Sequence, residues 1–130
     1  MDASKFKIEI VEDELLVALE VKLQLLNMGY DVTGIASNSM DALSLASETN
    51  PDVILMDISI KGDIDGIETA KLAKSKFGIP SVFISAFSEA ETKKRIDELS
   101  PLGYMPKPID YNILQGFLLK LLSEPALTHF

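Results

Sequence analysis

The fold of this chain is decided by residues 53–57, which read VILMD. Four consecutive apolar residues followed by an acid are typical of a central parallel strand that is buried on both faces and ends at a polar edge. Pro51 prevents the preceding helix from continuing into this run. A second run of the same kind, SVFIS at 81–85, opens directly after Pro80. The sequence therefore predicts two buried strands of a parallel sheet.

Outward from these runs, short apolar segments alternate with longer amphipathic ones five times. Strands are expected at 6–11, 30–36, 53–56, 81–85 and 102–105. The first helix is expected to end at Gly29, and the later ones to cover about 39–49, 66–77, 88–99 and 109–122, with a loop at 58–65. Asn38 or Ser39 is expected to cap the second helix and Gly78 to close the third. Five β–α units with short connections predict an α/β fold with helices on both faces of a parallel sheet.

The apolar spacing predicts which helix faces are buried. In the first helix, spacings of four, four and three predict a buried stripe of Leu15, Leu19, Leu23 and Leu26. In the third helix the inward residues are expected to be Ile67, Ala70, Ala73 and Phe77. The last helix carries an apolar stripe that is expected to lie mostly in the core, with part of it available to a partner: Ile113, Leu114, Phe117, Leu118, Leu121 and Leu122.

Composition limits the possible functions. The 130 residues fit one domain, 1–130, with a core at about 5–122 and a tail at 123–130. The absence of cysteine excludes a disulfide scaffold, a thiolate nucleophile and a cysteine zinc site, and the single histidine, His129, is next to last. A formal charge of −8 argues against direct binding to nucleic acid or to anionic membranes. Neither a signal peptide nor a bilayer-spanning run is found, so a cytoplasmic protein is expected.

Chemically active side chains follow the predicted strands. Residues 12–14, which read EDE, follow the first strand, Asp57 the third, Ser85 the fourth and Lys107 the fifth. The carboxyl ends of parallel strands share one edge, which is where such folds bind ligands. Carboxylates about 4 Å apart repel by about 4 kcal/mol at an effective dielectric near 20, so a cluster of them needs a cation. Mg²⁺ suits oxygen ligands and also bridges to a phosphoryl oxygen, so the edge predicts phosphoryl transfer to Asp57.

Five motifs then resemble one family. The segments 11–14 (VEDE), 53–57 (VILMD), 65–66 (DG), 85–86 (SA) and 103–108 (GYMPKP) together look like the receiver domain of response regulators, over about residues 5–122. The resemblance implies a flavodoxin-like, doubly wound (βα)5 fold with three layers and strand order 2-1-3-4-5. Two departures are a loop at 59–63 without the usual proline, with one extra residue, and Pro106 before the lysine.

The resemblance also implies roles for individual residues. Mg²⁺ would be held by Glu12, Asp13, Asp57 and the backbone carbonyl of Ser59, and Asp57 would accept the phosphoryl group. Lys107 would bind the phosphoryl group, with a cis Lys107–Pro108 bond, while Ser85 and Tyr104 would form the switch. Phe87 is expected to obstruct the hydrolytic water.

The same resemblance implies partners. A sensor histidine kinase or a phosphotransfer protein would phosphorylate the chain, which would otherwise catalyse at most its own phosphorylation and dephosphorylation. Since no output domain is seen in the sequence, a downstream protein would bind the face formed by 88–99, 102–105 and 109–122, or the domain would pass the phosphoryl group onward. Dimerisation on activation, the pathway and the lifetime of the phosphorylated state stay open.

Alternative interpretations exist for each motif. Residues 12–14 could be a first-turn acid cluster and Asp57 a turn residue. Residues 63–66 (DIDG) read as a turn and helix cap rather than a calcium loop, because the other calcium ligands are missing. A phosphohydrolase with an aspartyl-phosphate intermediate would need a second Asp where Ser59 stands, and a phosphate-independent binding module is the third alternative. Glu9 lies in the middle of a buried strand, where a charge is costly without a partner.

Overall fold

The computed structural model describes residues 6–86, 90–99 and 101–123, so Phe87, His129 and most of the expected tail lie outside the described residues. Five parallel strands form one sheet in the order β2-β1-β3-β4-β5. The strands are β1 (Lys7–Val11), β2 (Asp31–Ala36), β3 (Val53–Asp57), β4 (Ser81–Ser85) and β5 (Gly103–Pro106). The predicted doubly wound, flavodoxin-like strand order is confirmed.

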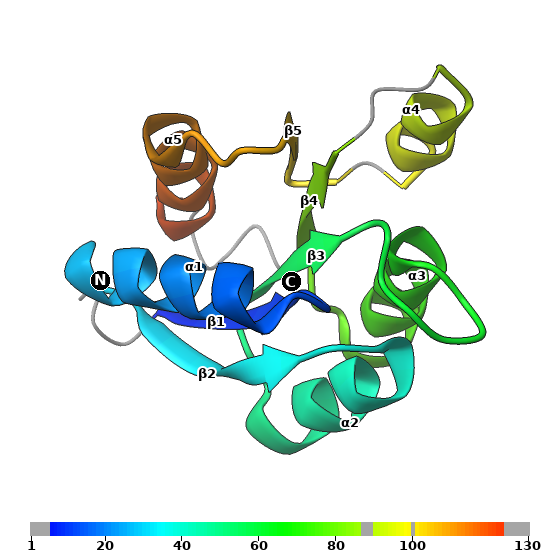
Figure 1. Cartoon of the computed structure of the whole chain (residues 1–130), viewed down its shortest axis with the longest axis horizontal. Helices are drawn as coiled ribbons and strands as arrows, with labels where there is room; N and C mark the ends of the chain where they lie inside the picture. Colours follow the sequence, from blue (N-terminus) through cyan, green and yellow to red (C-terminus); the bar gives the residue numbers. More distant parts are fainter. Residues whose placement is uncertain (1–5, 87–89, 100, 124–130) are drawn as a thin grey trace.

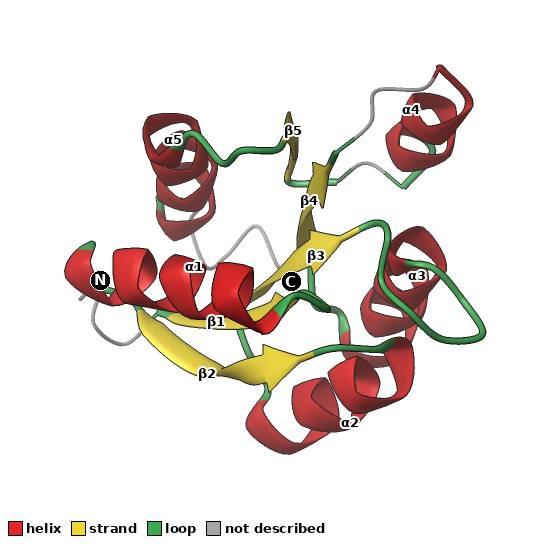
Figure 2. Cartoon of the chain, in the orientation of Figure 1, coloured by secondary structure: helices red, strands yellow, loops and turns green. Residues whose placement is uncertain are grey.

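Helices cover both faces of the sheet (Figure 1). The helices are α1 (Leu15–Asn27), α2 (Ser39–Thr49), α3 (Gly66–Phe77), α4 (Ala90–Asp97) and α5 (Tyr111–Leu122). Buried side chains of α1 and α5 share one apolar cluster with one face of the sheet, and those of α2, α3 and α4 share a second cluster with the other face. Figure 2 shows the resulting sheet between two helical layers, as predicted. Among the described residues, no helix has both the length and the apolar character that a membrane span requires.

The helix ends follow local capping chemistry. Asn38 caps α2 by accepting a hydrogen bond from the Asp41 amide at 2.9 Å, and Gly78 ends α3 with a φ of 71°. Gly29 follows α1 with a φ of 93°. Both glycines were predicted from residue type, and Asn38 is the one of the two predicted cap candidates, Asn38 and Ser39, that caps the helix. The boundaries of α2, α3 and β4 coincide with the predicted ones, and those of the other strands and helices lie within two residues of them.

The predicted buried face of α1 is wrong. Leu15, Leu19, Leu23 and Leu26 are 64%, 41%, 63% and 44% exposed, whereas Ala18, Val21 and Leu25 are buried. The helix carries two apolar stripes, and hydrophobicity alone does not distinguish them. The buried stripe, Ala18, Val21 and Leu25, belongs to the same apolar cluster as the sheet residues. The leucine stripe is left at the surface.

One further inward prediction fails. Phe77 is 36% exposed because it is the last residue of α3 and the chain turns away at Gly78. The stripe of α5 lies mostly in the core, as expected; Ile113 is 48% exposed because it lies one position before Leu114 and therefore about 100° around the helix from the buried residues. The remaining residues of the two stripes are buried or partly buried: Ile67, Ala70, Ala73, Leu114, Phe117, Leu118, Leu121 and Leu122.

Glu9 is a carboxyl group buried in the sheet. The residue is 0% exposed, and neither carboxyl oxygen has a hydrogen-bond partner among the described residues. Burial raises the pKa of Glu9 to about 8. Because a charged group there would lack both water and a partner, the side chain is protonated at neutral pH. Glu9 therefore needs no ionic partner, because its carboxyl group is uncharged in the folded chain.

We predict that Glu9 makes stability fall as the pH rises. Below about pH 4.5 the carboxyl is protonated in the folded and the unfolded chain; between this pH and about 8 only the unfolded chain releases the proton. The free energy of unfolding should therefore fall by about 1.4 kcal/mol per pH unit across that range and level off above it. Urea unfolding of the wild type and Glu9→Gln from pH 5 to pH 8 measures this contribution.

The variant should lack that part of the pH dependence. Glu48→Gln, which changes an exposed carboxylate on α2, is the matched control and should keep the wild-type profile. Parallel stability curves for the wild type and Glu9→Gln would show that Glu9 is ionised in the fold.

Gly66 lets α3 begin directly against the end of β3. A Cβ at this position would collide with the Asp57 carbonyl oxygen and would lie 2.8 Å from the Ile58 Cα. The Gly66 amide donates a hydrogen bond to the Ile58 carbonyl at 2.9 Å. Only glycine therefore permits this close contact, which fixes the position of the backbone beside Asp57.

We predict that Gly66→Ala destabilises the fold by about 1–3 kcal/mol, because the backbone must move to admit the methyl group. Gly116→Ala is the matched control: this position in α5 has no atom within 4 Å of an added Cβ. Relief of the helical glycine penalty should stabilise that variant by about 0.5–1 kcal/mol. Both values come from urea unfolding, and equal stability of Gly66→Ala and the wild type would contradict the steric argument.

Candidate functional site

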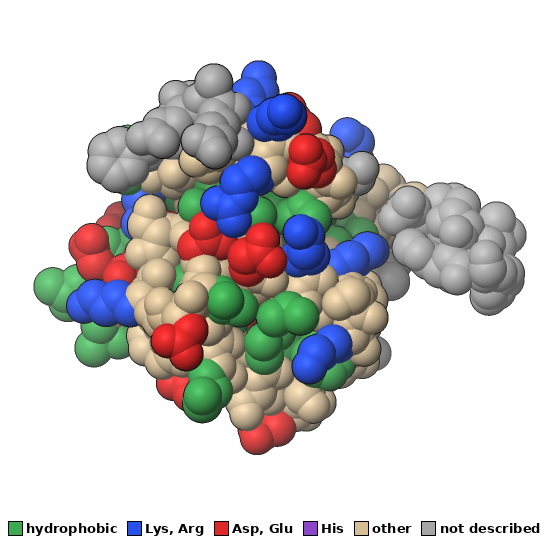
Figure 3. All heavy atoms as spheres, turned by 90° about the vertical axis from the view of Figure 1, so that its right-hand side faces the viewer, with side chains coloured by type: hydrophobic (Ala, Val, Ile, Leu, Met, Phe, Trp, Pro, Cys, Tyr) green, Lys and Arg blue, Asp and Glu red, His purple; other side chains and the backbone are tan. Residues whose placement is uncertain are grey.

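Four of the predicted site residues come from the carboxyl ends of four strands. Glu12 follows β1, Asp57 ends β3, Ser85 ends β4 and Lys107 follows β5. Because all strand pairs are parallel, these ends share one edge of the sheet. Figure 3 shows acidic and basic side chains meeting near the centre of one face of the molecule.

Lys107 joins two of the carboxylates. Its Nζ lies 2.7 Å from Glu12 Oε1 and 3.1 Å from Asp57 Oδ2. The side chains of Glu12 and Asp57 are only 6% and 5% exposed, and that of Lys107 is 25% exposed. The site is therefore a mostly buried charge cluster in which hydrogen bonds are shielded from water.

Asp13 adds a third carboxylate. One oxygen each from Glu12, Asp13 and Asp57 lies within 4.8 Å of the others. Glu12 Oε2 accepts a hydrogen bond from the Glu14 amide at 3.1 Å, and Asp57 Oδ1 accepts one from the Ser59 amide at 3.0 Å, so both side chains are held in place. Clustered carboxylate oxygens of this kind fit a hard divalent cation.

The charges perturb one another. Burial raises the pKa of Glu12 and the charge of Asp57 adds to this, while the Lys107 hydrogen bond opposes both; the net pKa is raised. Burial would lower the pKa of Lys107, but its hydrogen bonds to Glu12 and Asp57 outweigh burial, so the net pKa is raised. Lys107 therefore stays an ammonium at neutral pH and supplies a fixed positive charge to the cluster.

The two predicted switch residues lie on neighbouring strands: Ser85 is the last residue of β4 and Tyr104 the second residue of β5. Ser85 is 2% exposed, and its carbonyl accepts a hydrogen bond from the Lys107 amide at 2.8 Å. Tyr104 is half-buried and pairs with Phe83 across the two strands. The Lys107–Pro108 bond is cis, as predicted.

The loop at 58–65 is anchored at several points. Ile58 and Ile60 are buried, and Lys61 forms an isolated parallel bridge with Asn38. At the end of the loop Asp65 caps α3 by accepting a hydrogen bond from the Glu68 amide at 3.0 Å, which confirms the reading of this segment as a helix cap. The anchors show how a loop without the usual proline is ordered.

An ion pair between α3 and α4 was not predicted from the sequence. Arg95 Nη1 lies 2.9 Å from Asp65 Oδ2 and Nη2 lies 3.3 Å from Asp65 Oδ1. Burial would raise the pKa of Asp65, but the Glu68 amide and the Arg95 guanidinium outweigh it and lower the pKa. The only sequence signal was a basic residue on a charged helix, which is too common to be specific.

Comparisons with known proteins agree with this arrangement. Residues 8–118 match the family described as the response regulator receiver domain. The chain is 31% identical over 108 residues to the transcriptional regulatory protein PdtaR of Mycobacterium tuberculosis, which covers 83% of this chain and 52% of that protein. It is 33% identical to the probable transcriptional regulator ycf29 of Pyropia yezoensis, over 94% of this chain and 55% of that protein. The chain thus spans about half the length of these curated relatives.

A solved structure agrees as well. The signal receiver domain of a modulated diguanylate cyclase from Desulfovibrio desulfuricans G20 is similar with a TM-score of 0.83 and 34% identity, over 88% of this chain and 91% of that one. The sheet order, the acidic cluster with its lysine and these matches over most of the chain lead to one assignment. The chain belongs to the receiver domain family of two-component response regulators.

Proposed function

We propose that this receiver domain is a phosphorylation switch in which Asp57 accepts a phosphoryl group from a sensor histidine kinase or a phosphotransfer protein. The observation that carries the proposal is the position of Lys107, whose ammonium group contacts both Asp57 and Glu12. A buried carboxylate beside a fixed ammonium group is suited to accept a phosphoryl group, because the ammonium offsets the negative charge of the incoming oxygens.

The chemical step needs an attacking oxygen and charge compensation. An Asp57 carboxylate oxygen forms a bond to phosphorus while the bond from phosphorus to the donor breaks, and the donor leaves with that electron pair. Glu12, Asp13, Asp57 and the Ser59 backbone carbonyl would hold Mg²⁺, which supplies positive charge to the phosphoryl oxygens. Lys107 and the Ser85 hydroxyl donate hydrogen bonds to the remaining oxygens.

Phosphorylation then changes the surface. The phosphoryl group draws the Ser85 hydroxyl toward Asp57 and Tyr104 moves inward, which alters the face formed by α4, β5 and α5. The ion pair between Arg95 and Asp65 supports this coupling, because it connects α4 to the start of α3 beside the site. The population shifts only as far as the phosphoryl group interacts differently with the two states.

The output of this switch is a protein contact. The altered α4-β5-α5 face would control a downstream protein, and the domain would catalyse at most its own phosphorylation and dephosphorylation. Its location in the cytoplasm, its lack of direct contact with nucleic acid and membrane, and its dimerisation on activation stay predictions.

We predict that a small phosphodonor such as acetyl phosphate, with Mg²⁺, adds one phosphoryl group to the wild type. Asp57→Asn should add none, because the nucleophilic oxygen is replaced, and Asp13→Asn should react at least about tenfold more slowly, because one carboxylate of the cation site is lost. Intact-protein mass spectrometry measures the modification.

Asp63→Asn, in the exposed part of the loop, is the control and should react like the wild type. Equal phosphorylation of Asp57→Asn and the wild type would exclude Asp57 as the acceptor. Phosphorylation that continues at the same rate with excess EDTA would exclude the cation.

We predict a change across the switched face when beryllofluoride mimics the phosphoryl group. Amide NMR signals of α4, β5 and α5 should shift in the wild type and shift at least about twofold less in Ser85→Ala, because the hydroxyl that transmits the change is missing. Ser47→Ala, on the exposed side of α2, should shift like the wild type. Shifts confined to the residues next to Asp57 would contradict the switch.

A further inference from the structure

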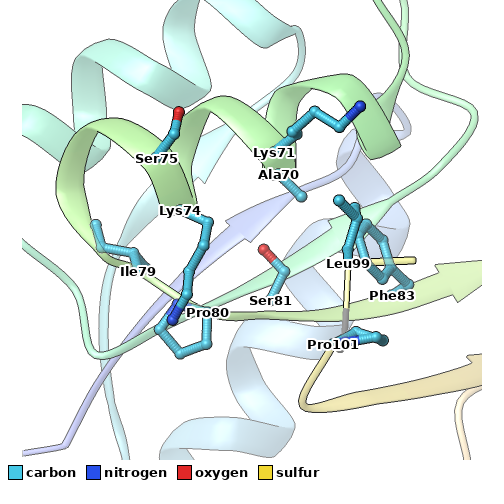
Figure 4. Close-up of a pocket in the computed structure, with 10 residues that line it drawn as sticks. All are labelled: Ala70, Lys71, Lys74, Ser75, Ile79, Pro80, Ser81, Phe83, Leu99 and Pro101. Atoms are coloured by element: carbon cyan, nitrogen blue, oxygen red, sulfur yellow. The ribbon is translucent and has the colours of Figure 1, made fainter. Parts of the chain in front are cut away.

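A cavity of about 240 Å³ lies at the other end of β4, away from the charge cluster. It lies between α3 and β4 and is closed on one side by Leu99 and Pro101 (Figure 4). Apolar side chains form most of the wall, chiefly Ala70, Ile79 and Phe83. The volume exceeds that of a roughly 150 Å³ cavity that takes up benzene and is below the range of about 300–1,000 Å³ for drug-sized ligands. The cavity therefore fits a molecule with a single ring or a short chain.

Ser81 places an unpaired hydroxyl group in this cavity. The residue is 5% exposed, and its Oγ is buried without a hydrogen-bond partner among the described residues. In Figure 4 the oxygen points from β4 toward α3, into the space below Ala70. A buried hydroxyl without a hydrogen-bond partner is unfavourable, because it has lost the hydrogen bonds that water would supply. A ligand atom that accepts a hydrogen bond from Ser81 removes this penalty.

Lys74 brings a positive charge to the same side of the cavity. Its side chain runs from α3 along the wall, and its nitrogen lies beside Pro80, which directly precedes Ser81 in the chain (Figure 4). Lys71 lies nearer the start of α3, and its ammonium is 3.8 Å from Glu68. Four polar side chains line the cavity: Lys71, Lys74, Ser75 and Ser81. The Ser75 hydroxyl donates a hydrogen bond to the Leu72 carbonyl at 3.2 Å and Lys71 lies beside Glu68, so Lys74 and Ser81 are the described lining residues whose donors no neighbour takes up.

We infer that this cavity binds a small monocarboxylate with an apolar body. The carboxylate accepts hydrogen bonds from Ser81 Oγ and Lys74 Nζ, and the apolar body contacts Phe83, Leu99 and Pro101. A neutral apolar molecule would leave Ser81 unpaired, and a doubly charged anion would meet too few donors for its oxygens. The inference does not depend on phosphorylation of Asp57, because no residue of the charge cluster lines this cavity.

Three probes, tested on the full chain, separate the contribution of the ligand's charge from that of its apolar ring. Benzoate has the charge and the ring, benzamide the ring without the charge, and acetate the charge without the ring. Benzoate should shift the amide NMR signals of Ala70, Ser81 and Phe83 in a saturable way, benzamide should bind about tenfold more weakly, and acetate should cause no saturable shift. No saturable shift with benzoate, or equal affinity for benzamide, would overturn the inference.

Two variants locate the binding groups. Ser81→Ala removes the hydroxyl without adding bulk, and Lys74→Gln keeps most of the side-chain length without the charge; each should weaken benzoate binding about tenfold. Lys76→Gln, on the same helix but outside the cavity, is the matched control and should bind like the wild type. If Ser81→Ala does not fold, Lys74→Gln decides alone. Benzoate binding that is equally strong in Lys74→Gln and Lys76→Gln would place the carboxylate elsewhere.

Discussion

The balance of charge at one edge of the sheet is the constraint on which the rest of this structure depends. Three carboxylates whose oxygens lie within 4.8 Å repel one another, and the ammonium group of Lys107 offsets part of this repulsion. This arrangement requires that β1, β3 and β5 all end at the same edge, which a parallel sheet ensures. It also requires that α3 begin close to Asp57, which Gly66 permits. The fold and the charge cluster are therefore specified together.

Most of the fold could be predicted because the signals are local. The central strands are continuous apolar runs bounded by proline, and the helix ends carry Asn38, Gly29 and Gly78 at positions where their backbone or side chain has a defined use. The buried face of α1 could not be predicted in this way. Its leucine stripe and its Ala18 stripe are both apolar, and the choice between them depends on which one packs against the sheet and α5. That packing is a tertiary property.

The site, too, has features that the sequence predicts locally and features that depend on tertiary contacts. The chain order of Glu12, Asp57, Ser85 and Lys107 sufficed to predict that they share an edge, because strand ends converge in any parallel sheet. The pairing of Arg95 with Asp65 could not be predicted, since it joins two helices whose separation the sequence does not encode locally. The same holds for Ser81: its position on a buried strand was expected, but the cavity that it faces is formed by α3 and by Leu99 and Pro101. Sequence patterns therefore predicted the individual helices and strands but not the side-chain contacts between them.

The buried carboxyl group of Glu9 gives the molecule an internal probe of its own opening. Its oxygens are shielded from solvent and have no partner among the described residues. A proton in such a place exchanges with water only when β1 separates from its neighbours or the helices above it move away. In heavy water, infrared spectroscopy can follow the exchange of the Glu9 carboxyl proton for deuterium. The rate of this exchange should therefore match the rate of amide exchange in the central strands. The exchange rate of this single side chain thus measures how often the centre of the sheet opens to solvent.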